Sequence, residues 1–138
     1  MSNKKSGTTF EQAFCIYAHE RGFWAHMMVA NHNGQPSDVI LCKNSTPALI
    51  DCKSCERNIF TFDRIEENQW TAMTIWKKAG NIHALFALKL SDEIRLIPYN
   101  TIKEFAGHGF KQFNHKQIIE NSYTFEEWEA RYFGNHPE

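Results

Sequence analysis

Long apolar runs are missing from this chain. None of its 138 residues belongs to a hydrophobic stretch that approaches the roughly 20 residues needed to cross a bilayer. The N-terminal segment, "MSNKKSGTT", is polar and has no hydrophobic region of the kind found in a signal peptide. We therefore expect a cytoplasmic protein that has no membrane partner.

A strong net charge is also missing. The 15 Lys and Arg residues nearly balance the 16 Asp and Glu residues, and the formal net charge is −1. A protein that coats nucleic acid by charge alone needs a large positive field, so the composition argues against that class. The balance remains compatible with an enzyme in which an acidic site offsets a local basic surface.

Cysteine is scarce, with four residues in the chain: Cys15, Cys42, Cys52 and Cys55. In a reducing compartment we expect thiols. Cys52-x-x-Cys55 has the spacing of half a zinc site, but no second Cys pair or His pair completes it. A small zinc-stabilised interaction domain is therefore kept as a weaker alternative.

What is present is an ordinary globular composition, 42% hydrophobic and 22% charged. The length suits a single domain over residues 1–138 with a real core. We find no repeat, linker or low-complexity segment. Residues 1–7 are expected to form a mobile arm, and residues 107–138 a C-terminal extension whose packing the sequence does not predict.

Hydrophobic periodicity and turn residues predict the order α-β-β-β-α-β-β-α, followed by one further helix near the C-terminus. The expected helices cover residues 8–22, 65–79, a short stretch from 101, and a last stretch from 124; the expected strands cover residues 23–29, 38–42, 48–55, 82–90 and 93–99. This pattern predicts an α/β fold in which helices flank a mixed central β-sheet.

One strand carries side chains that a core does not need. The segment "ALIDCKSCE", residues 48–56, is apolar except for Asp51 and Lys53 in its middle. Side chains alternate along a strand, so these two share one face at a spacing of about 7 Å. Ile50 and Cys52 then point to the other face. A carboxylate and an ammonium in a covered strand suggest chemistry, although an exposed surface pair is their commoner use.

A second carboxylate is expected near the first. Asp38 opens the preceding strand, and a hairpin turn near residues 44–45 would bring it opposite or diagonal to Asp51. Two neighbouring carboxylates repel each other, and a divalent cation relieves that repulsion. Oxygen ligands suit Mg²⁺ or Mn²⁺ rather than Zn²⁺. A lysine beside the metal, here Lys53, can orient a water or stabilise charge on a phosphate.

These residues resemble the core of the PD-(D/E)xK nucleases, in which an Asp on one hairpin strand precedes an acid-x-Lys motif on the next. Here the motif is "PSDVI" followed by "LIDCKS", with Asp38, Asp51 and Lys53. The segment "GTTFEQAFCIYAHERG" resembles the first helix of the RecU-type Holliday junction resolvases and places Glu11 at the acidic position of that helix. "NQWTAM" resembles the motif that contains the Gln of that family, here Gln69. The resemblance covers roughly residues 7–106.

The resemblance implies a restriction-endonuclease-like fold and a metal-dependent DNA endonuclease. It implies Mg²⁺, with Mn²⁺ as a substitute, and as substrate a Holliday junction or other branched DNA in recombination or repair, cut by a homodimer. Lys53 would orient or activate water, and Gln69 would support water or phosphate. The implied metal ligands are Glu11, Asp38, Asp51 and the backbone carbonyl of Cys52.

Departures from the family pattern keep simpler interpretations open. Asp51 stands where the family usually has Glu, and Asn68 stands where it has His. Thr8-x-x-Glu11 has the spacing of a helix capping box, so Glu11 can be explained as a cap. A DNA-binding module that has the fold but no activity is therefore the other alternative.

Cationic and aromatic residues are candidates for DNA contact. Lysine and arginine would hold phosphates without reading sequence. These candidates are Lys4, Lys5, Arg57, Arg64, Lys77 and Lys78. Phe60, Phe62 and Trp70 are candidates for stacking on bases, although packing in the core is the commoner use of such residues.

Overall fold

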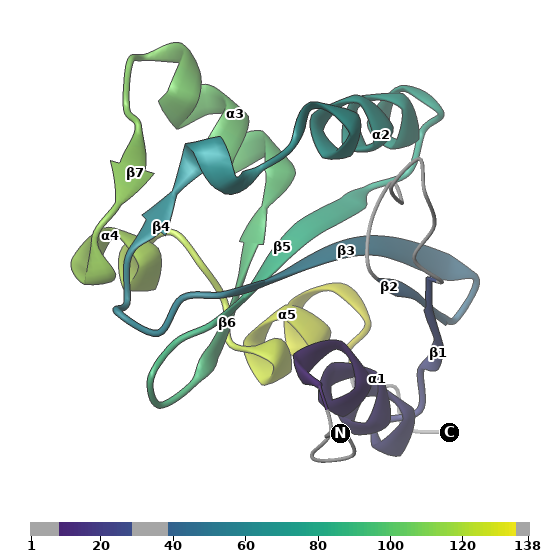
Figure 1. Ribbon diagram of the computed structural model, residues 1–138. Helices are drawn as coiled ribbons and strands as arrows, with labels where there is room; N and C mark the ends of the chain where they lie inside the picture. The colour runs from purple at the N-terminus through teal and green to yellow at the C-terminus, as the bar shows by residue number, and fades with distance from the viewer. Residues whose placement is uncertain (1–8, 29–38, 135–138) are drawn as a thin grey trace, which may run out of the picture.

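The computed structural model describes residues 9–28 and 39–134. Its centre is a five-stranded sheet with the order β1-β2-β3-β5-β6 (Figure 1). Strands β3 and β5 are parallel, and the other neighbours are antiparallel, so the sheet is mixed as the sequence predicts. The strands are β1 (Trp24–Met27), β2 (Val39–Lys43), β3 (Thr46–Ser54), β5 (His83–Lys89) and β6 (Ile94–Pro98).

The predicted hairpin of β2 and β3 is confirmed. Its turn residues, Asn44 and Ser45, have positive φ angles of 53° and 64°, which suits the two-residue turns that match the twist of a hairpin. Val39 pairs with Ile50 in the register of the two strands. Asp38 precedes Val39 in the chain and lies outside the described residues.

The first helix, α1 (Phe10–Glu20), has its N-cap one residue later than the sequence predicts. Thr9, and not Thr8, is the N-cap: the Gln12 N–H donates to Thr9 Oγ1 at 3.2 Å, and the Thr9 N–H donates to Gln12 Oε1 at 3.0 Å. The predicted capping box of Thr8 and Glu11 is therefore wrong, because the helix begins at Phe10 and its box is formed by Thr9 and Gln12. Glu11 is a partly exposed residue of the first turn.

Both faces of the sheet are covered, and the alternation along β3 assigns its side chains to them. Helices α1 and α5 (Phe125–Tyr132) lie on one face, while α2 (Glu67–Lys78) and α3 (Tyr99–Gly107) lie on the other (Figure 1). Ile50 and Cys52 pack in the cluster of the α1 and α5 face. Leu49 and Cys55 pack in the cluster of the α2 and α3 face. Asp51 and Lys53 lie between Leu49 and Cys55 at every second position along the strand, so their side chains point to the same face, towards α2.

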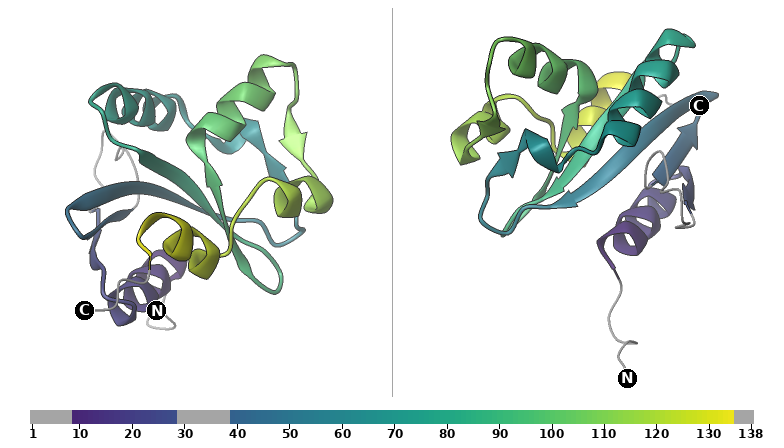
Figure 2. Two further views of the ribbon diagram at one scale, coloured as in Figure 1. Left: turned by 180° about the vertical axis from the view of Figure 1, so that it is seen from behind. Right: turned by 45° about the horizontal axis from the view of Figure 1, so that its top comes forward.

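Several short elements were not predicted. Strand β4 (Phe60–Thr61) pairs with β7 (Gln112–Phe113), and the two form a separate ribbon beside α3 (Figures 1 and 2). The 3-10 turn η1 (Phe62–Arg64) and helix α4 (His115–Glu120) are also new. Two-residue strands and a six-residue helix carry no periodicity of their own, so only their tertiary contacts define them.

The C-terminal segment packs against the same core. Trp128 of α5 is fully buried, and Phe125 and Phe133 lie beside it in the cluster of the α1 and α5 face. The Glu129 carboxylate accepts from Arg21 Nε at 2.5 Å and from Lys43 Nζ at 2.9 Å. Burial opposes ionisation of Glu129, but these two cations prevail and lower the pKa of its carboxyl group. Residues 107–134 therefore form part of the fold, and their packing stabilises α1 and the β2–β3 hairpin.

No helix in residues 9–28 and 39–134 has the length and apolar character needed to cross a membrane.

A buried histidine predicts a loss of stability in mild acid. His83 is 4% exposed, and its Nδ1 lies 3.4 Å from the Nε1 of Trp128, an N–H donor that requires an unprotonated Nδ1. Burial and the nearby Lys77 lower the pKa of His83. Below the unfolded-state pKa near 6.5 the unfolded chain binds a proton that the folded chain does not, so the free energy of unfolding falls as the pH drops from there towards the folded pKa.

Thermal unfolding between pH 8 and pH 5 measures this effect at fixed ionic strength. We expect the His83→Gln variant to lose part of the decrease that the wild type shows below about pH 6.5. The exposed His108→Gln variant is the matched control and should follow the wild type. Parallel profiles for wild type and His83→Gln would show that another group causes the acid sensitivity.

Candidate active site

The centre of the candidate site is a buried ion pair on β3. Asp51 is fully buried, and its Oδ2 lies 3.4 Å from Lys53 Nζ. The Lys53 side chain is 12% exposed, whereas the Asp51 side chain has no exposed surface. A buried charge is costly unless it is paired and hydrogen-bonded. Because well-packed apolar residues often replace such a pair without loss of stability, the charges suggest a function other than packing.

Gln69, in the first turn of α2, joins these two side chains. Its Nε2 donates to Asp51 Oδ1 at 3.4 Å, and its Oε1 accepts from Lys53 Nζ at 3.1 Å. The same Oε1 also accepts from the backbone N–H of Glu66 at 3.0 Å. The amide is therefore oriented at both ends, and Gln69 fixes the relative positions of the carboxylate and the amine. We call Asp51, Lys53 and Gln69 the β3–α2 cluster.

Glu66 has a part in this arrangement that the sequence analysis did not assign. Glu66 is the N-cap of α2 and forms a reciprocal capping box with Gln69. The spacing Glu66-x-x-Gln69 at the start of a helix was the available signal, although Glu is an uncommon N-cap. Because one amide both caps the helix and contacts the ion pair, the start of α2 is fixed relative to β3.

The β3–α2 cluster offers donors of the type that Mg²⁺ and Mn²⁺ prefer. The described part of the chain supplies the carboxylate oxygens of Asp51 and the amide oxygen of Gln69, which are hard ligands. No group of three His, Cys, Asp or Glu side chains that could hold a metal occurs within residues 9–28 and 39–134. The donor chemistry fits such an ion, and a full ligand set needs carboxylates beyond Asp51.

The remaining expected ligands are placed as follows. Asp38 is outside the described residues. Glu11 belongs to α1. Burial raises the pKa of the nearby Cys15 thiol, and the negative charge of Glu11 raises it further. The residues around Glu11 that are buried, Phe14 and Ala18, pack on the sheet face opposite to α2. Cys52 lies between Asp51 and Lys53 on β3.

Cys52 and Cys55, the two cysteines closest in sequence, pack on opposite sides of the sheet. Cys52 packs in the cluster of the α1 and α5 face, and Cys55 packs in the cluster of the α2 and α3 face. Both residues are free thiols and nearly inaccessible. Burial raises the pKa of the Cys55 thiol, although the neighbouring Arg64 acts in the other direction. The pair therefore lacks the shared face that half of a zinc site requires.

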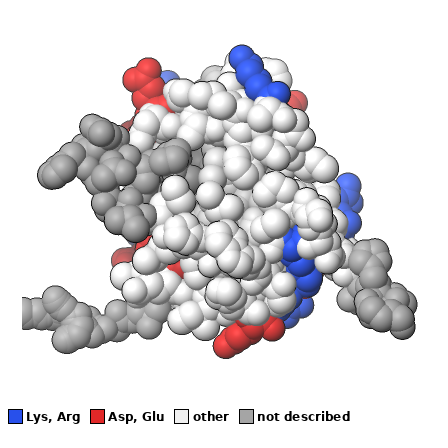
Figure 3. Space-filling view, turned by 90° about the vertical axis from the view of Figure 1, so that its right-hand side faces the viewer, with Lys and Arg blue, Asp and Glu red and all other residues white. Residues whose placement is uncertain are grey.

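Only some of the candidate DNA-binding cations lie near the β3–α2 cluster. Arg64 Nη1 donates to the carbonyl of Ser54, the residue after Lys53, at 2.8 Å. Lys77 and Lys78 end α2, about 12 Å along the helix axis from Gln69. On the side of the molecule that carries β1, the centre is largely uncharged, and Lys and Arg side chains gather along one edge (Figures 1 and 3). Lys4 and Lys5 lie outside the described residues.

The aromatic candidates for base stacking divide into two groups. Phe60 and Phe62 are buried core residues, at 0% and 7% exposure. Trp70 is partly buried and packs edge-to-face against Phe86 and Tyr99. Phe60 and Phe62 therefore cannot present a ring face to a base without leaving the core.

No model of a known protein family and no curated protein sequence matches the chain. Solved structures do match. One is the Holliday junction resolvase Hjc of the archaeal hyperthermophile Archaeoglobus fulgidus, with a TM-score of 0.69 and 16% sequence identity over 90% of this chain and 98% of that chain. This likeness confirms the restriction-endonuclease-like fold that the sequence predicts.

Proposed function

We propose that this protein is a metal-dependent DNA endonuclease that cuts branched DNA. The observation that carries the proposal is the β3–α2 cluster, in which a buried carboxylate, an amine and an amide are held within 3.4 Å of one another. The likeness to the Hjc resolvase adds that this fold serves junction cleavage in another protein. The RecU-type motifs in the sequence favour the same substrate.

Each residue has a proposed role. Asp51 and Asp38 would hold Mg²⁺ together with the backbone carbonyl of Cys52, and Glu11 would contribute directly or through water. When bound, the metal supplies Lewis acidity and makes a water more acidic. Lys53 Nζ orients the attacking water and offsets the charge that develops on the phosphate. Gln69 positions Lys53 and Asp51 through its two ends.

A homodimer is part of the proposal. The motif provides one Asp51–Lys53 pair per chain, whereas resolving a four-way junction requires cuts in two opposed strands. A twofold dimer presents two identical sites to such a substrate. We therefore propose that two copies nick the opposed strands at symmetric positions.

Cleavage of matched linear, flap and four-way DNA substrates tests this proposal. With Mg²⁺ we expect symmetric nicks in the four-way junction at a rate above that for linear duplex, and with EDTA we expect none. Light scattering on the free protein and on its junction complex should report two chains. A monomer in both states that cuts linear duplex as fast as a junction would retain the nuclease and reject the resolvase.

A further inference from the structure

We propose that the β4–β7 ribbon carries a binding groove for an unpaired DNA strand beside the β3–α2 cluster. The inference rests on the proposed nuclease function and specifies part of its substrate. The groove consists of two hollows that meet at the ribbon, and its far wall comes from the C-terminal segment that sequence resemblance did not cover.

The first hollow has a volume of about 450 Å³ and lies where β3 ends. Its lining includes Ser54, the residue directly after Lys53, and the exposed arginines Arg57 and Arg64. Arg64 is anchored by its bond to the Ser54 carbonyl, so its charge is held at the end of the strand that carries the site. Phosphates of a strand leaving the site would meet these two cations first.

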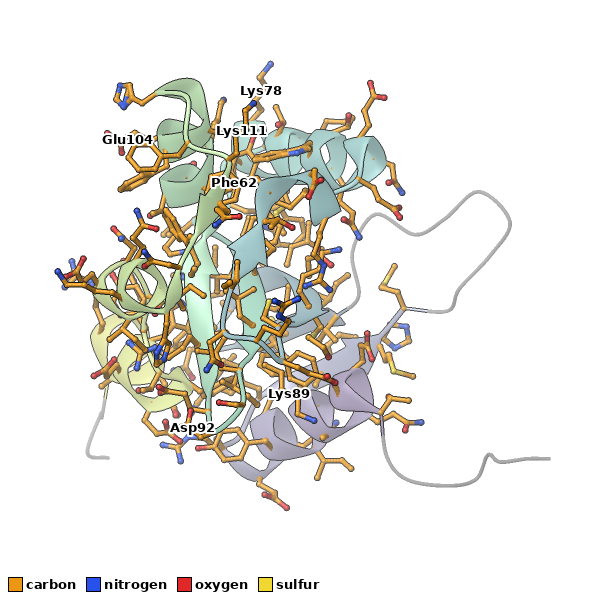
Figure 4. All side chains as sticks on the ribbon, turned by 60° about the vertical axis from the view of Figure 1, so that its left-hand side comes forward. Phe62, Lys78, Lys89, Asp92, Glu104 and Lys111 are labelled. Atoms are coloured by element: carbon orange, nitrogen blue, oxygen red, sulfur yellow. The ribbon has the colours of Figure 1, made fainter. Side chains whose placement is uncertain are left out.

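The second hollow has a volume of about 600 Å³ and lies between η1, the start of α2 and the loop before β7. Phe110, Lys111 and Trp70 are among its lining residues. The Phe62 N–H donates to the Lys111 carbonyl at 2.9 Å, and these two residues lie on neighbouring segments (Figure 4). Trp70 directly follows Gln69 on α2, so one wall of this hollow comes from the helix turn that also carries Gln69.

The ribbon connects the two hollows. Thr61 and Gln112 line both of them and are direct partners in the β4–β7 register. Gln112 is exposed and Thr61 is partly exposed. Their amide and hydroxyl groups can donate to and accept from base edges or phosphates. A strand that crosses the ribbon would therefore remain in contact with polar groups along its path.

The chemistry of the groove favours unpaired DNA over duplex. Arg57, Arg64 and Lys111 exceed the acids in the two linings, Glu56 and Asp63, by one positive charge. Phe110 is 42% exposed and keeps its ring at the surface by packing edge-to-face on Phe105 at 5.0 Å. An exposed ring beside a cation suits a splayed base, whereas the bases of a duplex are stacked on one another. The expected ligand is the unpaired strand of a flapped or gapped branch, which a fully base-paired four-way junction does not expose.

Binding of a short fluorescent oligothymidine by the full chain in EDTA tests the groove without cleavage. We expect Phe110→Ala to weaken this binding about tenfold, and Phe110→Leu, which keeps apolar volume but removes the ring, to weaken it comparably. Lys111→Ala should reduce affinity and lower the salt slope by about 0.7. Affinity for a blunt linear duplex should change less than about twofold in the two Phe110 variants, because a duplex offers no splayed base to stack on the ring.

Matched controls lie elsewhere on the surface. Ile82→Ala removes an apolar side chain that is 64% exposed, and Lys116→Ala removes a lysine whose side chain is 83% exposed; both should bind as the wild type does. Equal oligothymidine binding by wild type, Phe110→Ala and Lys111→Ala would overturn the groove even if the protein cuts junctions. Binding that depends on Phe110 and Lys111 in a protein that cuts no DNA would support the groove and reject the nuclease.

Discussion

Replacing Asp51 by Asn is expected to reduce DNA cleavage by about a thousandfold or more, which corresponds to a loss of ~4 kcal/mol of transition-state stabilisation. The substitution keeps the shape of the side chain and its contact with Gln69 Nε2, but it removes the charge that would hold the metal. DNA binding should persist or tighten, because one negative charge leaves the phosphate site. Single-turnover cleavage of a four-way junction and a separate binding titration measure the two effects.

A folding check belongs with this experiment, because Asp51 is fully buried beside Lys53. The thermal midpoint and the circular dichroism spectrum of Asp51→Asn should remain those of a folded chain, since Gln69 Oε1 still accepts from Lys53. Asp92→Asn, at the exposed turn before β6, is the matched control and should cut normally. Cleavage by folded Asp51→Asn at the wild-type rate would show that the β3–α2 cluster is not the active site.

Truncating Trp128 to Ala is expected to lower the free energy of unfolding by about 3–5 kcal/mol. Trp128 is fully buried and contacts the rings of Phe23, Phe125 and Phe133, with centroid separations of 5.0 to 5.8 Å. The substitution leaves a large cavity between α5 and the sheet and also removes the donor to His83. Urea unfolding followed by fluorescence or circular dichroism measures the change.

Trp24→Ala is the internal comparison for this prediction. Trp24 lies on β1 and is 56% exposed, so its truncation should cost less than about 1 kcal/mol. A similar loss for both variants would mean that the burial of the Trp128 ring does not determine its contribution to stability. A negligible loss for Trp128→Ala would mean that packing of α5 on the sheet contributes little to stability.

Much of the sheet follows from short-range features of the sequence. Asn44 and Ser45 form the expected turn, and this turn sets the β2–β3 register. Alternation along β3 places Asp51 and Lys53 on one face because side chains of a strand alternate whatever the rest of the chain does. The N-cap of α1 was predicted at Thr8 but lies at Thr9. Two adjacent threonines precede the helix, and both can act as a cap, so the sequence does not decide between them.

The sequence by itself determined the polar pair of β3, the apolar faces of the helices and the hairpin turn, since each depends on residues only a few positions apart. The tertiary structure decided the rest. Only packing of α2 on the sheet brings Gln69 to Asp51 and Lys53, across 16 to 18 residues of sequence. Only pairing of β4 with β7 brings Thr61 to Gln112. Contacts between distant segments depend on the whole fold, because no local propensity rewards them until the chain has closed the intervening loop.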